Sequence, residues 1–308
     1  MEAGESQVTN SEAVSGDGVP RSPERMAEVN GVRLCLQTFG RPSDPAILLL
    51  GGASSSMDWW EEEFCTRLAK GPRFVIRFDY RDTGRSVSYG AGAPPYTGPD
   101  LMADALGLLD TLEVAHAHLV GVSMGGAIAQ ALALDHPERV ATLTLIATSA
   151  VGPLDAELPP MEDRLRAVLD APAPQPDWSD REAVITYLVE GQRPFTGSLS
   201  FEEDRLRAIA ARVVERSTDI AASMTNHWLL DGGETSRYAV GEITAPTLIL
   251  HGTEDPLFRF PHAEALAAAI PGARLIPLEG VGHQTPPHAA WPVAIPAILR
   301  HTAHGAQA

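Results

Sequence analysis

A serine between two glycines is the strongest chemical signal in the sequence. Residues 121–125 read GVSMG, follow the apolar run 118–120 and open an alanine- and leucine-rich stretch that Pro137 ends. In this strand–turn–helix context, the G-x-S-x-G pattern places a serine nucleophile on a sharp turn. Glycine at both flanking positions removes side chains that would collide with neighbouring backbone. The pattern therefore predicts that Ser123 is a nucleophile, and the alternative is a helix-capping serine in a glycine-rich turn.

Two loops further along the chain supply the partners that a serine nucleophile needs. A serine hydroxyl is a weak nucleophile unless a base, oriented by an acid, takes its proton. In an open α/β sheet these partners follow on later loops, the acid first and the histidine second. Asp255 comes after the apolar run 247–250, and Pro256 biases it to an extended or turn conformation. We predict that Asp255 is the acid, with the adjacent Glu254 as the alternative.

His283 is the predicted base among ten histidines. It ends the glycine-rich loop 279–283 (EGVGH), which follows the last apolar run, and Gly282 allows a close approach. Chain order and loop position both favour this histidine. His288 is the fallback, and His251, at the end of a strand, is predicted to be structural.

Backbone amides near the serine are predicted to form an oxyanion hole, which needs two N–H donors. One donor is predicted from Met124, the residue after the nucleophile. The other is predicted from the loop 51–56 (GGASSS), where it is Gly52 or Ala53. The alternative for this loop is an ordinary strand-to-helix turn.

Three tryptophans, Trp59, Trp60 and Trp228, are the predicted substrate contacts. An apolar cleft lined by such side chains suits an aliphatic or aromatic acyl ester. The alternative is that Trp59 and Trp60 only pack the helix 58–68 onto the sheet, because buried aromatic residues commonly belong to the core.

Short apolar runs alternate with longer segments of helical spacing. The runs are mostly unbroken and aliphatic, as expected of strands buried on both faces. Their alternation with helices predicts an α/β fold with a mostly parallel central sheet flanked by helices. The predicted strands are 46–50, 74–78, 117–120, 141–147, 247–250 and 273–277, and the clearest predicted helices are 100–112 and 123–136.

One region interrupts this alternation. Residues 151–240 contain no convincing buried strand, begin proline-rich and continue with helical patterns. This predicts a helical cap, or lid, inserted into a core of residues 24–150 and 241–308, and the insertion has the size of a subdomain. Residues 1–23 are acidic and nearly free of large apolar side chains, so a disordered tail is predicted. The segment 301–308 is predicted to fray for the same reason.

Charge and cysteine content exclude several classes of protein. The chain has 308 residues with 23 basic and 40 acidic side chains, a net charge of −17. Nucleic-acid binding needs clustered lysine and arginine, which the sequence lacks, so we predict no nucleic-acid partner. Two isolated cysteines predict neither a disulfide framework nor a zinc site. Without a long apolar run or a signal peptide, we expect no membrane association and a cytoplasmic location.

These motifs, in this order, resemble those of the α/β-hydrolase superfamily. The likeness covers roughly residues 24–301 and includes the serine, acid and histidine candidates, the Gly-Gly loop and the helical insertion. Residues 79–86 (DYRDTGRS) also resemble the D-x-R-x-x-G-x-S loop common in that superfamily, where the loop is structural. The resemblance implies an α/β-hydrolase fold with an inserted cap.

Further segments narrow the resemblance. The strings at 78–86, 121–125 and 134–137 (LDHP) are similar to those of aclacinomycin methylesterase-type enzymes and of the broader esterase and cofactor-free haloperoxidase-like group. Many members of the superfamily begin the oxyanion loop with His-Gly, whereas this chain has Gly-Gly at 51–52. That departure slightly favours the methylesterase group.

The resemblance implies a serine carboxylesterase that acts on a small-molecule ester through an acyl-enzyme, with no metal and no organic cofactor. Ser123 argues against the haloalkane dehalogenases and epoxide hydrolases of the superfamily, which use aspartate. Perhydrolase-like chemistry and C–C or lactone hydrolysis share the triad and remain alternatives. A non-catalytic ligand receptor on the same fold is a further alternative, against which the intact triad weighs.

Overall fold

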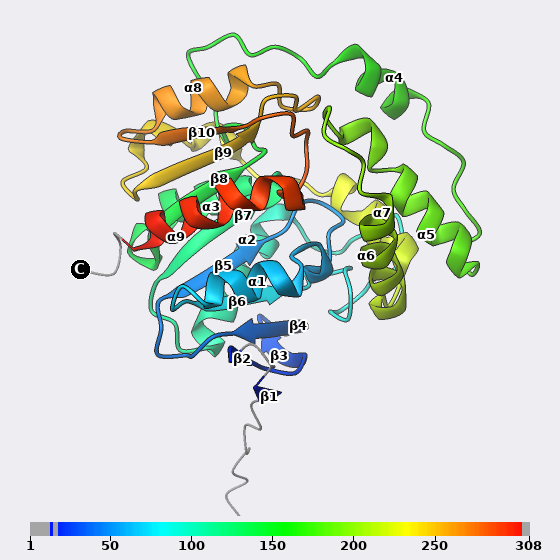
Figure 1. Ribbon diagram of the computed structural model, residues 1–308, viewed down its shortest axis with the longest axis horizontal. Coiled ribbons are helices and arrows are strands. Elements are labelled where there is room, and N and C mark those ends of the chain that lie inside the picture. The colour runs from blue at the N-terminus through cyan, green and yellow to red at the C-terminus, as the bar shows by residue number, and fades with distance from the viewer. Residues whose placement is uncertain (1–12, 15–17, 304–308) are drawn as a thin grey trace, which may run out of the picture.

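The computed structural model describes residues 13–14 and 18–303 and is built around a ten-stranded sheet (Figure 1). The sheet order is β1-β2-β4-β6-β5-β7-β8-β9-β10, and β3 pairs with β4 outside that path. Neighbouring strands from β6 to β10 along the path are parallel, which confirms the predicted mostly parallel sheet. The strands are β1 (Ala13–Val14), β2 (Pro20–Arg21), β3 (Arg25–Val29), β4 (Val32–Phe39), β5 (Ala46–Leu50), β6 (Phe74–Phe78), β7 (Ala117–Val122), β8 (Val140–Ile146), β9 (Thr247–Gly252) and β10 (Arg274–Leu278).

The antiparallel edge of the sheet is absent from the sequence-based prediction. β3 and β4 form a hairpin, and β4 pairs antiparallel with β6. Asn30 and Gly31 turn the hairpin with positive φ values of 50° and 77°, the backbone that an Asn-Gly turn favours. β4 mixes polar with apolar residues, so a search for unbroken apolar runs overlooks it. The Asn-Gly pair is the signal that could have found the hairpin.

Part of the predicted tail 1–23 is ordered. Residues 1–12 and 15–17 lie outside the described residues. Pro20–Arg21, however, forms β2, which pairs with β1 and with β4. The prediction of disorder is therefore wrong for residues 18–23, because backbone hydrogen bonds to a sheet edge hold a segment that has little apolar surface of its own.

The last helix, α9 (Trp291–Thr302), reaches further than predicted. His301 is buried, and its Nε2 lies 2.9 Å from the carbonyl oxygen of Leu143. Thr302 is fully buried beside it. Fraying is therefore the wrong prediction for these two residues, and residues 304–308 lie outside the described part of the chain.

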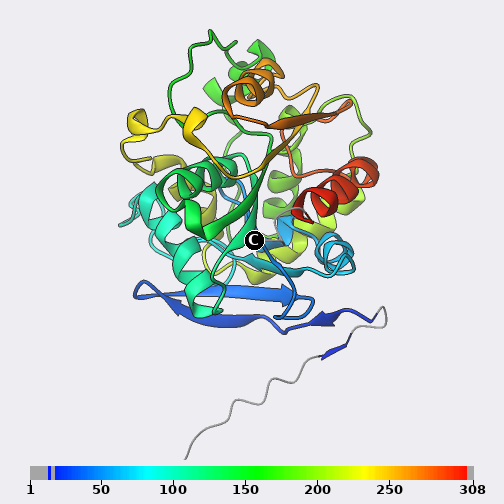
Figure 2. The same cartoon turned by 90° about the vertical axis from the view of Figure 1, so that its left-hand side faces the viewer.

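Helices cover both faces of the sheet (Figure 2). Successive residues of a strand point to opposite faces, so Leu48 and Leu50 of β5 enter one apolar cluster, and Ile47 and Leu49 enter the other. The first cluster lies under α2 (Gly98–Thr111), α3 (Met124–Asp135) and α8 (Pro261–Ala269), and the second under α1 (Glu62–Ala69) and α9.

The segment between β8 and β9 is helical, and no strand occurs in residues 147–246, all of which the structure describes. α5 and α6 pack on each other through an apolar cluster of their own, in which Val184, Leu188, Ile209 and Val213 are buried. Figure 1 shows these helices on the right, beyond one end of the strands. The helices are α4 (Asp163–Asp170), α5 (Arg181–Glu190), α6 (Glu203–Arg216) and α7 (Ile220–Thr225).

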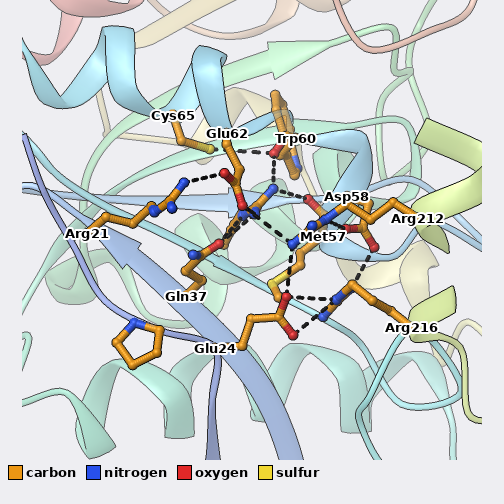
Figure 3. Close-up of polar contacts among 12 residues, drawn as sticks. Arg21, Glu24, Gln37, Met57, Asp58, Trp60, Glu62, Cys65, Arg212 and Arg216 are labelled. Carbon is orange, nitrogen blue, oxygen red and sulfur yellow. Dashed lines mark hydrogen bonds and ion pairs between the residues drawn. The ribbon is translucent and has the colours of Figure 1, made fainter. Parts of the chain in front are cut away.

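A buried charge network fastens α6 to the core (Figure 3). Arg216, at the end of α6, has 2% of its side chain exposed and pairs with Asp58 and with Asp79, whose Oδ2 lies 2.7 Å from Nη2. Its Nε lies 3.0 Å from Glu24 Oε1. Burial raises the pKa of the Asp79 carboxyl, although the Arg216 guanidinium acts in the opposite direction. The network therefore joins α6 to three segments that are distant from it in the sequence.

Replacing Arg216 with methionine is expected to lower the free energy of unfolding by about 3–5 kcal/mol, because Asp58 and Asp79 would stay buried without their partner. Urea unfolding followed by circular dichroism measures the loss. Arg207, on the same helix, pairs with Glu182 at 3.1 Å on the surface, so Arg207→Met should cost less than about 1 kcal/mol. Equal losses in the two variants would show that the buried network contributes nothing beyond a surface ion pair.

Candidate active site

Ser123 stands on a strained turn between β7 and α3. Its φ of 51° and ψ of −116° lie in a region that residues with a side chain rarely adopt. The flanking glycines make the turn possible, because a Cβ at Gly121 would lie 2.3 Å from Gly125 O, and one at Gly125 would lie 2.3 Å from Leu50 O. The Ser123 N–H donates to Ile146 O at 3.0 Å, which ties the turn to β8.

The structure brings the predicted serine, histidine and aspartate together in one hydrogen-bonded chain. His283 Nε2 lies 3.0 Å from Ser123 Oγ, and His283 Nδ1 lies 2.8 Å from Asp255 Oδ2. The other carboxylate oxygen of Asp255 accepts the N–H groups of Leu257 at 2.8 Å and Phe258 at 2.9 Å. A carboxylate only accepts, so Nδ1 carries the proton and Nε2 is left to accept from the serine hydroxyl. This arrangement can transfer the serine proton to the imidazole.

The alternative acid and base lie outside this chain of hydrogen bonds. The Glu254 carboxylate accepts from the Ser198 N–H at 2.6 Å and from its hydroxyl at 2.7 Å, in the inserted segment. His288 pairs at 3.4 Å with Glu61 on the surface. Neither position therefore competes geometrically with Asp255 and His283.

Two phenylalanines frame the imidazole of His283. The Phe258 ring meets it edge-on with centroids 5.5 Å apart, and the Phe195 ring lies 6.0 Å away. The His283 N–H donates to Phe195 O at 2.7 Å, and a Cβ at Gly282 would lie 2.1 Å from that same oxygen. Gly282 thus allows the histidine loop to press against the inserted segment. Phe258 is missing from the sequence-based prediction, since an aromatic residue after an aspartate loop carries no distinctive spacing.

His251 lies directly behind the aspartate, as its predicted structural role implies. Its Nε2 is 2.6 Å from Phe258 O and 3.4 Å from Asp255 Oδ2, and the side chain is fully buried. Burial lowers the pKa of His251. Its imidazole is therefore neutral and donates through Nε2 to Phe258 O. The Asp255 carboxylate thus remains available to His283.

The predicted oxyanion donors lie next to Ser123. Met124 begins α3, and an N–H in the first turn of a helix has no intrahelical acceptor. A Cβ at Gly52 would lie 3.7 Å from Ser123 Cβ, so the loop passes beside the nucleophile. The next two amides along the loop have acceptors, because Ser54 N–H donates to His227 Nδ1 and Ser55 N–H donates to Gly52 O. The loop thus presents Gly52 and Ala53, and the choice between them stays a prediction.

The three predicted substrate-contacting tryptophans occupy different environments. Trp60 is 2% exposed and packs against Phe64 with ring centroids 5.6 Å apart, so it is a core residue, and its assignment to the substrate is corrected. Trp59 packs against the apolar cluster of the inserted segment. Trp228 is 63% exposed, and its Nε1 donates to Ser54 Oγ at 3.1 Å, beside the oxyanion loop. Contact of Trp59 and Trp228 with substrate remains a prediction.

Two kinds of feature are absent from the described residues. None of the histidine, cysteine, aspartate and glutamate side chains in this part of the chain gather in threes or more in a way that could hold a metal ion. Among the helices of residues 18–303, none is long and apolar enough to cross a membrane.

The fold and the site together define an α/β hydrolase: the sheet is mostly parallel, the serine stands on a strained turn, and its partners follow later strands of the sheet. Residues 45–285 match the family model described as alpha/beta hydrolase fold, and the chain belongs to this family. The chain is 35% identical over 294 residues to rhodomycin D methylesterase DauP of Streptomyces sp. strain C5, covering 91% of this chain and 98% of that one. Identity to rhodomycin D methylesterase DnrP of Streptomyces peucetius is also 35%, with the same two shares.

Solved structures give the same fold. The enol-lactonase of Burkholderia xenovorans LB400 superposes with a TM-score of 0.66 at 25% sequence identity, covering 91% of this chain and 99% of that chain. The sequence-based expectation of the α/β-hydrolase superfamily and of the methylesterase-type group within it is therefore confirmed.

Proposed function

We propose that this protein hydrolyses a carboxylic ester of a small molecule through an acyl-enzyme, with Ser123 as nucleophile, His283 as base and Asp255 as the acid that orients the base. The observation that carries the proposal is the unbroken hydrogen-bond chain from Ser123 Oγ to Asp255 at a strained strand-to-helix turn. Support also comes from two relatives named as methylesterases, each aligned over 91% of this chain.

The hydrogen-bond chain sets the order of proton transfers. His283 Nε2 takes the Ser123 proton as Oγ attacks the ester carbonyl carbon, and Asp255 stabilises the imidazolium. The amide of Met124 and one amide of the loop 51–56 hold the negative charge that develops on the carbonyl oxygen. The imidazolium then protonates the departing alcohol as the C–O bond breaks. Water, deprotonated by His283, attacks the acyl-enzyme and releases the acid.

We also propose that residues 151–240 act as a cap over this site. Two contacts support the proposal, one with the histidine loop and one with the oxyanion loop. The 3₁₀ turn Arg193–Phe195 contacts the histidine loop through Phe195 O, 2.7 Å from His283 N. Trp228, in η4 (Asn226–Leu229), donates to Ser54 Oγ on the oxyanion loop. A substrate that reaches the serine would then pass between this segment and the core.

The substrate we propose is a methyl ester of an apolar acid. The two methylesterase relatives support the methyl group. Trp228 and Leu229 support the apolar acid, because they leave 63% and 53% of their surface exposed next to the oxyanion loop. An exposed indole offers a flat face on which an aromatic acyl group can stack.

The methyl and butyl esters of 2-naphthoic acid test this specificity. We expect kcat/KM for the methyl ester to exceed that for the butyl ester about 10-fold or more, since one misfitted methylene in a pocket is worth roughly 1–3 kcal/mol. Released naphthoate is followed by chromatography, with Ser123→Ala as the blank. Equal rates or a preference for the butyl ester would remove the methylesterase proposal and leave a general esterase.

A further inference from the structure

The inserted segment reaches the oxyanion loop, defined as residues 51–56, through two neighbouring side chains. His227 Nδ1 accepts the Ser54 N–H at 3.0 Å, and Trp228 Nε1 donates to Ser54 Oγ at 3.1 Å. Both side chains belong to η4 and lie more than 170 residues from Ser54 in the sequence. One residue of the oxyanion loop is thus held at its backbone and at its side chain by the same short turn.

Ser54 is a position where such support is needed. Its φ is 60°, in the left-handed region that residues with a side chain adopt at a cost in free energy. The hydrogen bond from its N–H fixes the peptide plane between Ala53 and Ser54. That peptide follows directly the one that carries the Ala53 N–H, one of the two candidate oxyanion donors. The loop passes Ser123 at Gly52, where an added Cβ would lie 3.7 Å from Ser123 Cβ.

The imidazole of His227 is held in one orientation and one tautomer. Its Nε2 lies 2.9 Å from Arg81 O, and because a carbonyl only accepts, Nε2 carries the proton and Nδ1 is free to accept. The rings of Tyr80 and Tyr96 meet the imidazole edge-on, at 5.9 Å and 6.5 Å between centroids. The side chain is 6% exposed, and burial lowers the pKa of His227, which keeps the imidazole neutral. A neutral, fixed imidazole is a suitable acceptor for a backbone amide.

The end of the loop has a second anchor. Asp79 Oδ1 accepts the Met57 N–H at 2.8 Å, and Ser55 N–H donates to Gly52 O at 3.2 Å within the loop. The acceptor of the Met57 N–H is a core residue, which also pairs with Arg216, whereas the acceptor of the Ser54 N–H is a residue of the inserted segment. Within the loop that joins β5 to Met57, the backbone N–H of Ser54 is thus held by the side chain of His227.

We propose that His227 is a positioning residue that sets the oxyanion loop from the inserted segment, so that the oxyanion hole takes its working shape only while η4 is docked. This inference rests on the proposed function, because the loop amides matter only if a negative charge develops beside Ser123. His227 itself touches neither the nucleophile nor the base; it acts through Ser54.

Two substitutions separate the two hydrogen bonds of His227. In His227→Asn, the side-chain oxygen can occupy the place of Nδ1 and still accept from Ser54, while the bond to Arg81 O is lost. In His227→Gln, the longer amide reaches towards Arg81 O and leaves the Ser54 N–H without its acceptor. We expect the Gln variant to lose about 100-fold in kcat with KM changed less than about 3-fold, as for a misplaced catalytic group. The Asn variant should stay within about 5-fold of the wild-type kcat.

Amide exchange gives a readout that does not depend on turnover. Deuterium uptake of a peptide covering residues 51–57 should rise in the Gln variant and stay near wild type in the Asn variant. His288→Gln, which alters a surface histidine away from the loop, is the matched control and should change neither uptake nor kinetics. Thermal unfolding of all variants shows that each is folded at the assay temperature.

The outcomes distinguish this inference from the proposed function. An active wild type together with a Gln variant that keeps its kcat, or with Gln and Asn variants that lose kcat equally, would overturn the role of His227 alone. A folded wild type that hydrolyses no ester would overturn the proposed function and, with it, the effect of His227 on an oxyanion hole. A selective loss of kcat and of loop protection in the Gln variant would establish the inference.

Discussion

Ser123→Ala is expected to lower kcat for ester hydrolysis by roughly 10⁵–10⁶-fold, as removal of the nucleophile does in serine hydrolases with a complete triad. The reason is specific to the geometry: Ser123 Oγ is the atom that lies 3.0 Å from His283 Nε2, and alanine leaves the imidazole without a proton to take. A fluorophosphonate should label the wild type at Ser123 and leave the variant unlabelled.

The control for this variant is Ser179→Ala. The Ser179 hydroxyl donates to Asp177 Oδ1 at 2.6 Å on the surface of the inserted segment, and its loss should leave kcat unchanged. Alanine keeps the backbone of the strained turn, so the Ser123 variant should also unfold at close to the wild-type urea concentration. Residual activity within 10-fold of wild type, or a label on another serine, would show that Ser123 is not the nucleophile.

Asp255→Asn is expected to lower kcat by about 10⁴-fold while the fold is retained. The N–H groups of Leu257 and Phe258 both donate to Oδ1, so the asparagine oxygen takes that place and its NH₂ group faces His283 Nδ1. Nδ1 must then accept, the imidazole proton moves to Nε2, and Nε2 can no longer accept the Ser123 proton. The loss follows from the tautomer and leaves the packing intact.

Glu254→Gln is the matched control for the aspartate variant. Its carboxylate contacts Ser198 in the inserted segment, so kcat should stay within about 3-fold of wild type, because a surface polar contact is worth little. Steady-state kinetics of the two variants on one ester compares them directly. An inactive Glu254 variant beside an active Asp255 variant would reverse the assignment of the acid.

The parallel part of the fold could be predicted because each strand is an unbroken apolar run. All six predicted strands are present, and each ends within two residues of its predicted bounds. β4 was missed because Arg33, Gln37 and Thr38 interrupt its apolar residues, although it lies inside the sheet and pairs with β3 on one side and β6 on the other. The helical insertion could be predicted because residues 151–240 lack a strand pattern. Its contacts with the core could not be predicted from the sequence.

The triad candidates could be ranked from the sequence because chain order and loop glycines constrain them. Trp60 could not be placed, since an indole beside a loop looks the same whether it packs on Phe64 or lines a cleft. His227 carried no local signal at all. Its partners, Ser54 and Arg81, are brought to it only when the inserted segment docks, and such long-range pairing is invisible to spacing.

We expect the buried anchor of Arg216 to limit the direction in which the inserted segment opens. Lifting the end of α6 would separate the guanidinium from Asp58 and Asp79 and leave two carboxylates buried without their partner. The opposite part of the segment is packed more loosely: α4 buries only Leu165 and leaves Val168 and Leu169 42% and 44% exposed. We therefore expect that, when substrate enters, the inserted segment pivots about its Arg216 end and moves most at α4 (Asp163–Asp170).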